Sequence, residues 1–253
     1  MSKTPNRKKS FVLITSIFTW MMMLHAGHSY ASNTPDDQKV VFHHIDSLYN
    51  HLQPADTRPA AKVFRDGMIG YYAIKQKNLL ENNRYITLID FSLPSTERRL
   101  WVIDLENLQI VQHSLVAHGR NTGGEFAVNF SNTISSKMSS LGFYLTGSTY
   151  HGKYGLSLYL DGIEPEINDN ARKRTIVMHS APYVTPKFIA QYGRLGRSYG
   201  CPAVPPSKSK AIIQTIKDKS CLFIYYPVPS YFAKSKYLGD QLFTYEGAAN
   251  SSM

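Results

Sequence analysis

Apolar residues near the start of the chain recur every three or four positions. Between residues 40 and 52 this spacing, typical of an amphipathic helix, is carried by Val41, Ile45, Leu48 and Leu52. A second helical pattern runs over residues 60–77. Residues 56–59 separate the two helices, and Pro59 suits a first helical turn. We expect this helical pair to pack as a cap on the domain that follows, rather than to form a module of its own.

From Arg84 onward the pattern changes to short runs of β-branched and aromatic residues. These runs predict strands over residues 85–89, 100–103, 109–111, 115–117, 142–146, 156–160, 175–178 and 222–226. Short strands separated by turns are typical of a β-sandwich or barrel, so we predict a mostly β fold with largely antiparallel strands. Residues 208–217 predict one amphipathic helix after the last cluster of turn residues, with Ser207 as its N-cap.

The N-terminus has the three parts of a secretory signal peptide. Basic residues within positions 3–9 precede an apolar run over residues 11–24, and small residues stand at Ser29 and Ala31. We predict cleavage after Ala31 and export to the periplasm or cell envelope. The apolar run is shorter than the roughly 20 residues of a membrane-spanning helix, and retention as an anchor is the alternative. The mature chain then divides into a helical extension (32–83), a β domain (84–227) and a C-terminal extension (228–253).

Charge and length narrow the classes of partner. The full chain has a formal charge of +10, and removal of the four basic residues before Ala31 leaves +6. A mildly basic protein suits a negatively charged envelope polymer. No dense run of Lys and Arg alternates with aromatic residues, so we expect no nucleic-acid partner. The remaining roughly 220 residues are enough for one domain with a full core.

The segment from Met178 to Val204 holds the residues with the most specific chemistry. His179 follows an apolar run, and Cys201 follows a Ser-Tyr-Gly sequence. A thiol needs a base or a positive environment to become a thiolate at neutral pH, and histidine is the usual base. Gly200 permits a sharp turn in which the N–H groups of Gly200 and Cys201 point at a developing oxyanion. The segment therefore predicts a cysteine acyl-transfer site.

The surroundings of the two cysteines differ. Residues 193–197 are typical of a loop and are poor core material, which favours an accessible Cys201 over a packed one. Arg194 and Arg197 in this loop add positive charge that would favour the thiolate. Cys221 begins an apolar run, so we expect it to be buried and inert. A disulfide between Cys201 and Cys221 is the alternative, and it would abolish the proposed chemistry.

These residues resemble the signature of the YkuD-type L,D-transpeptidases, the cysteine enzymes that remodel bacterial peptidoglycan. That family has a His, a loop and then Ser/Thr-His-Gly-Cys, whereas this chain has Tyr199 where most members have the second His. Together with residues 89–92 and 99–104, the segment is similar to a divergent branch, the murein L,D-transpeptidase catalytic domain, which tolerates an aromatic residue there. The resemblance covers residues 84–227.

The resemblance implies a role for each residue of the site. Cys201 would attack a peptidoglycan stem peptide and form a thioester, His179 would transfer the proton, and the main-chain carbonyl of Ser180 would orient the imidazole. Contacts with the substrate are implied for Tyr144, Tyr183, Arg194, Arg197 and Tyr199. The two arginines would pair with substrate carboxylates, and the alternative interpretation is that they belong to a solvated loop.

We expect neither a cofactor nor a metal. His113, His118 and His151 have no Cys, Asp or Glu at ligand spacing. An acidic run over residues 161–169 has no apolar surroundings that would raise the pKa of one carboxyl group. We therefore expect a solvated loop or a lid there, rather than the carboxylate pair of a glycosidase.

Two classes of function follow from this pattern. The first is an enzyme that passes the acyl group to an amine, as an L,D-transpeptidase, or to water, as a carboxypeptidase or crosslink-cleaving hydrolase. The second is a non-catalytic peptidoglycan-binding protein of the envelope. The presence of both His179 and Cys201 favours the enzyme, because a binding protein needs neither residue. The same dyad serves transfer and hydrolysis, so the pattern predicts the nucleophile and not the acceptor.

Overall fold

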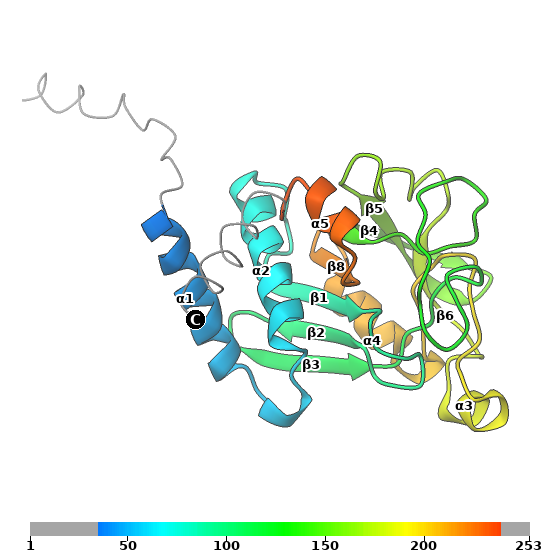
Figure 1. Cartoon of the computed structure of the whole chain (residues 1–253). Helices are drawn as coiled ribbons and strands as arrows, with labels where there is room; N and C mark the ends of the chain where they lie inside the picture. The colour runs from blue at the N-terminus through cyan, green and yellow to red at the C-terminus, as the bar shows by residue number, and fades with distance from the viewer. Residues whose placement is uncertain (1–34, 239–253) are drawn as a thin grey trace, which may run out of the picture. The chain divides into compact units, whose positions relative to one another are not determined.

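The computed structural model describes residues 35–238, and its centre is one mixed β-sheet (Figure 1). Its strands are β1 (Tyr85–Asp90), β2 (Leu100–Asp104), β3 (Gln109–Ser114), β4 (Gly142–Gly152), β5 (Gly155–Gly162), β6 (Val177–Ser180), β7 (Ala203–Val204) and β8 (Cys221–Tyr225). They lie in the order β3-β2-β1-β8-β4-β5-β6-β7. The pairs β1–β8 and β6–β7 are parallel, and the other neighbouring pairs are antiparallel. The prediction of a mostly β, largely antiparallel fold is confirmed.

The sheet curls until its two edge regions nearly meet. Beyond β3 the chain continues to Ala117, whose N–H donates to the carbonyl oxygen of Ala203 in β7 at 2.8 Å. Gly119 and Ser198 form a second bridge farther along. The run predicted as a strand at residues 115–117 is this closing contact and not a separate strand. The single sheet therefore forms a nearly closed barrel.

The helices of the described chain are α1 (Pro35–His51), η1 (Ala55–Thr57), α2 (Ala61–Gln76), α3 (Pro186–Tyr192), α4 (Pro206–Ile216) and α5 (Pro229–Lys234). The helix predicted after Cys201 is present as α4, but its predicted N-cap was wrong. Pro205 is the N-cap, without a side-chain hydrogen bond, and Pro206 begins the helix. Proline has no N–H to be capped and its fixed φ suits a first helical turn, so Ser207 falls inside the helix.

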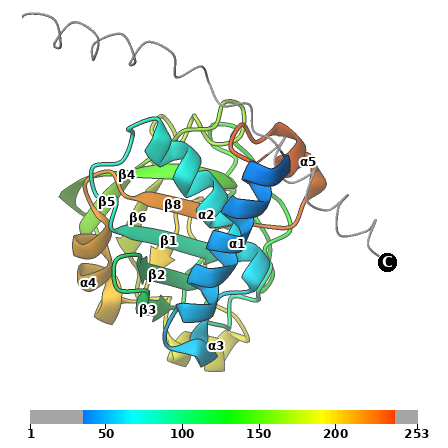
Figure 2. The same cartoon turned by 90° about the vertical axis from the view of Figure 1, so that its left-hand side faces the viewer.

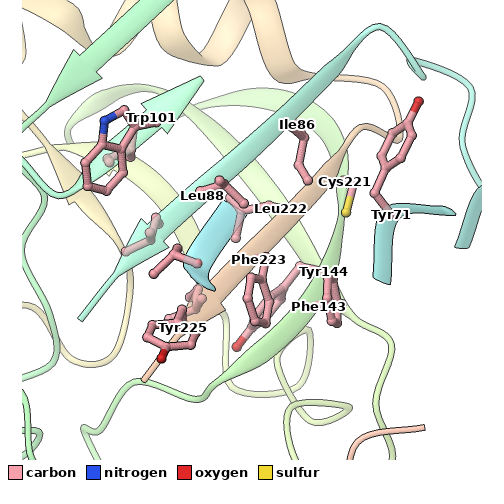
Figure 3. Close-up of a cluster of buried hydrophobic side chains, with 14 of the residues drawn as sticks. Tyr71, Ile86, Leu88, Trp101, Phe143, Tyr144, Cys221, Leu222, Phe223 and Tyr225 are labelled. Carbon is pink, nitrogen blue, oxygen red and sulfur yellow. The ribbon is translucent and has the colours of Figure 1, made fainter. Parts of the chain in front are cut away.

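Helix α2 packs closely against the sheet, as Figure 2 shows across β1 and β8. Two glycines of α2 face the strands. A Cβ on Gly67 would lie 2.5 Å from Cδ2 of Leu88, and a Cβ on Gly70 would overlap the ring of Phe143. That ring stacks on Phe223 of β8 at 4.3 Å between centroids, in the aromatic cluster of Figure 3. The predicted helical cap thus shares the core of the β domain.

The C-terminal segment also joins the core. Glu164 is fully buried, and its carboxylate accepts hydrogen bonds from the N–H of Phe143 at 2.7 Å, from the Tyr231 hydroxyl at 3.1 Å and from the Ser235 hydroxyl. The expectation of a solvated acidic loop is therefore wrong for Glu164, because its neighbours replace the water that a carboxylate needs. Tyr231, in α5, and Leu238 belong to the main core, so described residues beyond 227 pack on the domain.

Candidate active site

The β6–β7 pair brings the predicted histidine and cysteine to neighbouring positions. Strand β6 carries His179, and the parallel ladder pairs His179 with Ala203 of β7. Cys201 precedes Ala203 by two residues, so this register places Cys201 level with Val177 at the start of β6. Because side chains alternate along a strand, Val177 and His179 project from the same face. Two segments far apart in sequence therefore meet at one end of the sheet order.

The sulfur of Cys201 has backbone partners suited to both of its protonation states. The thiol is partly exposed and is not in a disulfide. Its Sγ lies 3.7 Å from the carbonyl oxygen of Thr175, which accepts from a thiol, and the N–H of Val177 donates to the same sulfur. Thr175 has a φ of +54°, a left-handed conformation that a β-branched residue rarely adopts. The turn into β6 is thus shaped around this sulfur.

The electrostatic surroundings keep the resting thiol protonated. Burial raises the pKa of Cys201, while the hydrogen bond from Val177 and the charge of Arg174 act in the opposite direction. The net direction is upward, so a base must take the proton before Cys201 can attack. The expectation that Arg194 and Arg197 would favour the thiolate was wrong, because the cation that acts on the sulfur is Arg174.

His179 is held in the orientation of a base. It is 8% exposed, and its Nδ1 donates to the carbonyl oxygen of Ser180 at 2.8 Å, the contact that the resemblance implied. This bond leaves the lone pair on Nε2. The ring of Tyr154, from the turn between β4 and β5, stacks on the imidazole at 5.2 Å between centroids. Burial lowers the pKa of His179, so the imidazole is neutral at pH 7.

The turn before Cys201 is closed by Ser198. Its hydroxyl donates to the carbonyl oxygen of Cys201 at 2.6 Å and accepts from the N–H of Gly200 at 3.1 Å. Gly200 has a φ of +123°, and a Cβ there would lie 2.6 Å from the carbonyl oxygen of Met138, so only glycine fits. The expectation that the N–H of Gly200 would face an oxyanion was wrong, because the Ser198 hydroxyl takes this hydrogen.

The tyrosines predicted to contact substrate lie in different places. Tyr183 is half-buried, and burial and the charge of a Cys201 thiolate raise the pKa of its hydroxyl. Tyr199 is 66% exposed, with the ammonium of Lys137 5.2 Å from its ring centroid. Tyr144 is fully buried and its hydroxyl donates to the carbonyl of Ser140. The assignment of Tyr144 to the substrate was wrong, because its ring is part of the core (Figure 3).

The two predicted arginines stabilise loops beside the site. Arg194 donates to the carbonyl oxygen of Leu195 at 2.7 Å. Arg197 donates to the carbonyl oxygens of Gly123 at 2.9 Å and Arg120 at 3.2 Å, which joins the loop before Cys201 to the loop after the barrel closure. The pKa of Arg197 is lowered by burial and by the charges of Arg194 and Arg120. Three arginines therefore lie together next to the Ser198 turn.

Sequence reasoning missed Arg174, Val177 and Tyr154. Arg174 belongs to an Arg-Lys-Arg run that is typical of a solvated surface, and Val177 acts through its main chain, so neither has a recognisable signal. Tyr154 lies in a tight turn flanked by glycines, which is the only hint that it projects from a hairpin. All three reach the site through the sheet pairing.

No metal site is evident in the part of the chain that the structure describes. Residues 35–238 contain no group of three His, Cys, Asp or Glu side chains arranged to hold an ion. His118 is buried, and its Nδ1 accepts from the guanidinium of Arg99 at 2.8 Å.

The other thiol, Cys221, is buried and free, as expected (Figure 3). Within residues 35–238 no helix has the length and apolar character needed to cross a bilayer.

The chain belongs to the L,D-transpeptidase catalytic domain family, of the YkuD type, whose family model matches residues 56–225. The match begins in the connection between α1 and α2, so the family domain includes helix α2 as well as the barrel. No curated protein sequence matches the chain.

Solved structures that match the chain include L,D-transpeptidases and a cell-shape protein. The chain is 8% identical to an L,D-transpeptidase from Mycobacterium smegmatis, with 56% of this chain and 59% of that chain covered and a TM-score of 0.36. It is 16% identical to the helical cell shape determining protein from Campylobacter jejuni, with coverage of 73% and 65% and a TM-score of 0.40. For an L,D-transpeptidase from Stackebrandtia nassauensis the identity is 15%, the coverage 84% and 89%, and the TM-score 0.34. The match spans less than two thirds of the first two proteins.

Proposed function

We propose that the protein is an exported cysteine acyltransferase that acts on peptidoglycan stem peptides. Family membership supports a peptidoglycan-related activity. The observation that carries the proposal is the pairing of β6 with β7, which sets the neutral, oriented His179 beside a partly exposed Cys201. The predicted signal peptide lies outside the described residues and supports export to the periplasm or envelope.

The reaction begins with a proton transfer from Cys201 to Nε2 of His179. The resulting thiolate attacks the carbonyl carbon of a stem-peptide amide, and a carbon–sulfur bond forms. As the carbon–nitrogen bond breaks, the imidazolium returns the proton to the leaving amine, and a thioester remains on Cys201. An acceptor amine then attacks the thioester, losing its proton to His179, and the thiol is released. The N–H of Cys201, which lies close enough to the sulfur to lower its pKa, would meet the oxyanion as it forms.

Hydrolysis is the second candidate within the same mechanism. If water replaces the acceptor amine, the product is a shortened or uncrosslinked stem. The arginines beside the Ser198 turn suit substrates that carry carboxylates, and this holds for transfer and hydrolysis alike. A non-catalytic peptidoglycan-binding protein would have no need for the hydrogen bond that orients His179.

The test is mass analysis of muropeptides after incubation with purified mature protein. We expect new crosslinks for a transferase, and shortened or separated stems for a hydrolase. Cys201→Ala should give no product above a protein-free control. Cys221→Ala is the matched control, because its thiol is buried away from the site. The folded variant should have the same activity per molecule as the unmodified protein. Unaltered muropeptides with a reactive Cys201 thiol would support the binding protein instead.

A further inference from the structure

Arg174 is a half-buried cation without a carboxylate partner among residues 35–238. Its Nη1 donates to the carbonyl oxygen of Ser131 at 2.8 Å and to the hydroxyl of Ser140. Its Nη2 donates to the hydroxyl of Ser136 at 3.1 Å and to the carbonyl oxygen of Met138. These four acceptors belong to one loop, residues 131–140, so one guanidinium fixes the loop's conformation. Neutral acceptors leave its positive charge uncompensated.

The same guanidinium lies against the turn that presents the nucleophile. A Cβ on Gly200 would be 3.3 Å from Nη2 of Arg174 and 2.6 Å from the Met138 carbonyl oxygen that Nη2 binds. The hydroxyl of Ser139, from the same loop, donates to the carbonyl oxygen of Gly200 at 3.1 Å. The loop and the turn are therefore packed together with Arg174 at their contact.

Three ionisable groups of the proposed site belong to one stretch of the chain around β6. Arg174 precedes β6, His179 lies within β6, and Tyr183 follows β6. Of these, Arg174 is the permanent cation, and its charge lowers the pKa of Cys201 against the effect of burial. His179 is neutral at rest, and burial holds the pKa of Tyr183 above its ordinary value, so that its hydroxyl is also neutral.

We propose that Arg174 is a positioning residue of the Cys201 site, which fixes the 131–140 loop against the Gly200 turn and holds a positive charge beside the sulfur. This inference rests on the proposed function, because it assigns Arg174 a part in activating the same nucleophile. The charge of Arg174 opposes the effect of burial and stabilises the Cys201 thiolate once a base has taken the proton.

Arg172 provides a matched control two residues away. Its guanidinium forms a two-pronged ion pair with Asp161, at 2.7 Å for both nitrogens, and its side chain is about half exposed. It is absent from the groups that act on Cys201. Replacing Arg172 removes the same charge from the same segment without touching the 131–140 loop.

The experiment measures the rate of Cys201 alkylation by iodoacetamide against pH, in full-length mature protein carrying Cys221→Ala. We expect Arg174→Met to shift the profile toward alkaline pH by about one unit, which slows alkylation at pH 7 about tenfold. Arg174→Lys keeps the charge, so its alkylation rate should depend on pH almost as it does in the unmodified protein. Arg172→Met should leave the profile unchanged.

The outcomes separate this role from a structural one and from the proposed reaction. If folded Arg174→Met, checked by circular dichroism, keeps the unmodified profile, Arg174 has no part in activating the thiol and the proposal fails. Should Arg174→Met not fold, Arg174→Gln serves the same comparison; an equal shift in Arg172→Met would also overturn the proposal. Alkylation needs no peptidoglycan, so the two proposals can fail separately. If Arg174→Met shifts the profile while the unmodified protein leaves muropeptides unaltered, the role of Arg174 is supported and the proposed function is contradicted.

Discussion

At the scale of single residues, the site depends on contacts that keep two titratable groups in their neutral forms. Burial raises the pKa of Cys201 and lowers that of His179, so at pH 7 the pair is thiol and imidazole rather than an ion pair. Tyr154 covers the imidazole, and Ser180 fixes which nitrogen carries the hydrogen. A neutral pair becomes reactive when substrate arrives, because proton transfer then coincides with attack.

We therefore expect Tyr154→Ala to raise the pKa of His179 toward its ordinary value of about 6.5, because the ring that covers the imidazole is gone. A neutral imidazole is needed as base, so the loss of activity on acidification would begin at higher pH in the variant. NMR titration of the His179 ring proton measures the shift. Tyr154→Phe keeps the stacked ring and should titrate like the unmodified protein; an identical titration in the alanine variant would exclude this role for Tyr154.

At the scale of elements, the barrel and helix α2 fold as one packing unit. Gly67 and Gly70 let the helix approach β1 and β8 so closely that the aromatic ring of Phe143 occupies the space a side chain would take. Phe143 is itself held by stacking on Phe223. Helical spacing in the sequence predicted α2, but only this contact explains why glycines, poor helix formers, are present within it.

We expect Gly70→Ala to lower the free energy of unfolding by about 1–3 kcal/mol, the usual cost of overpacking a core. Alanine would gain roughly 1 kcal/mol in helix propensity, but the added methyl group overlaps the Phe143 ring, which is stacked on Phe223. Urea unfolding of the purified protein measures the change. Gly124→Ala, where a Cβ meets nothing within 4 Å, should unfold like the unmodified protein. A Gly70→Ala protein as stable as the original would show that α2 is not pressed against Phe143.

At the scale of the whole molecule, closure of the barrel places a buried basic pair behind the active site. Arg99 is fully buried and donates to the carbonyl oxygens of Val116 and Leu93 as well as to His118. The main chain of His118 accepts from the N–H of Ser198, so this pair supports the turn that precedes Cys201. Burial and the neighbouring charge of Arg99 lower the pKa of His118 to about 3.

The low pKa of His118 predicts how stability depends on pH. Below pH 6.5 the unfolded chain binds a proton at His118 that the folded chain does not, so stability is lost as the pH falls from about 6.5 toward 3. The slope is about 1.4 kcal/mol per pH unit for one proton. We expect His118→Asn, which keeps an acceptor for Arg99, to flatten the dependence between pH 6.5 and 4 in urea unfolding. His151→Asn, at an exposed position, should follow the original slope; parallel slopes for all three proteins would refute the assignment.

The sequence by itself determined those features of the fold and of the site that depend on local residue pattern. Apolar spacing predicted helices α1, α2 and α4 and most strands, because period and residue type follow local backbone geometry. The residue types at His179 and Cys201 predicted an acyl-transfer pair, because few other residues supply that chemistry. Cys221 was expected to be buried from its apolar run, and it is.

Only the tertiary structure decided which other groups surround the sulfur. Arg174 and the N–H of Val177 reach Cys201 because β6 pairs in parallel with β7, and no local pattern encodes that pairing. The two errors have other causes. The pairing of β4 with β8 carries Tyr144 into the core, and the turn before Cys201 bonds the N–H of Gly200 to the Ser198 hydroxyl. Local spacing specifies what a residue can do, whereas long-range strand pairing fixes which atoms it meets.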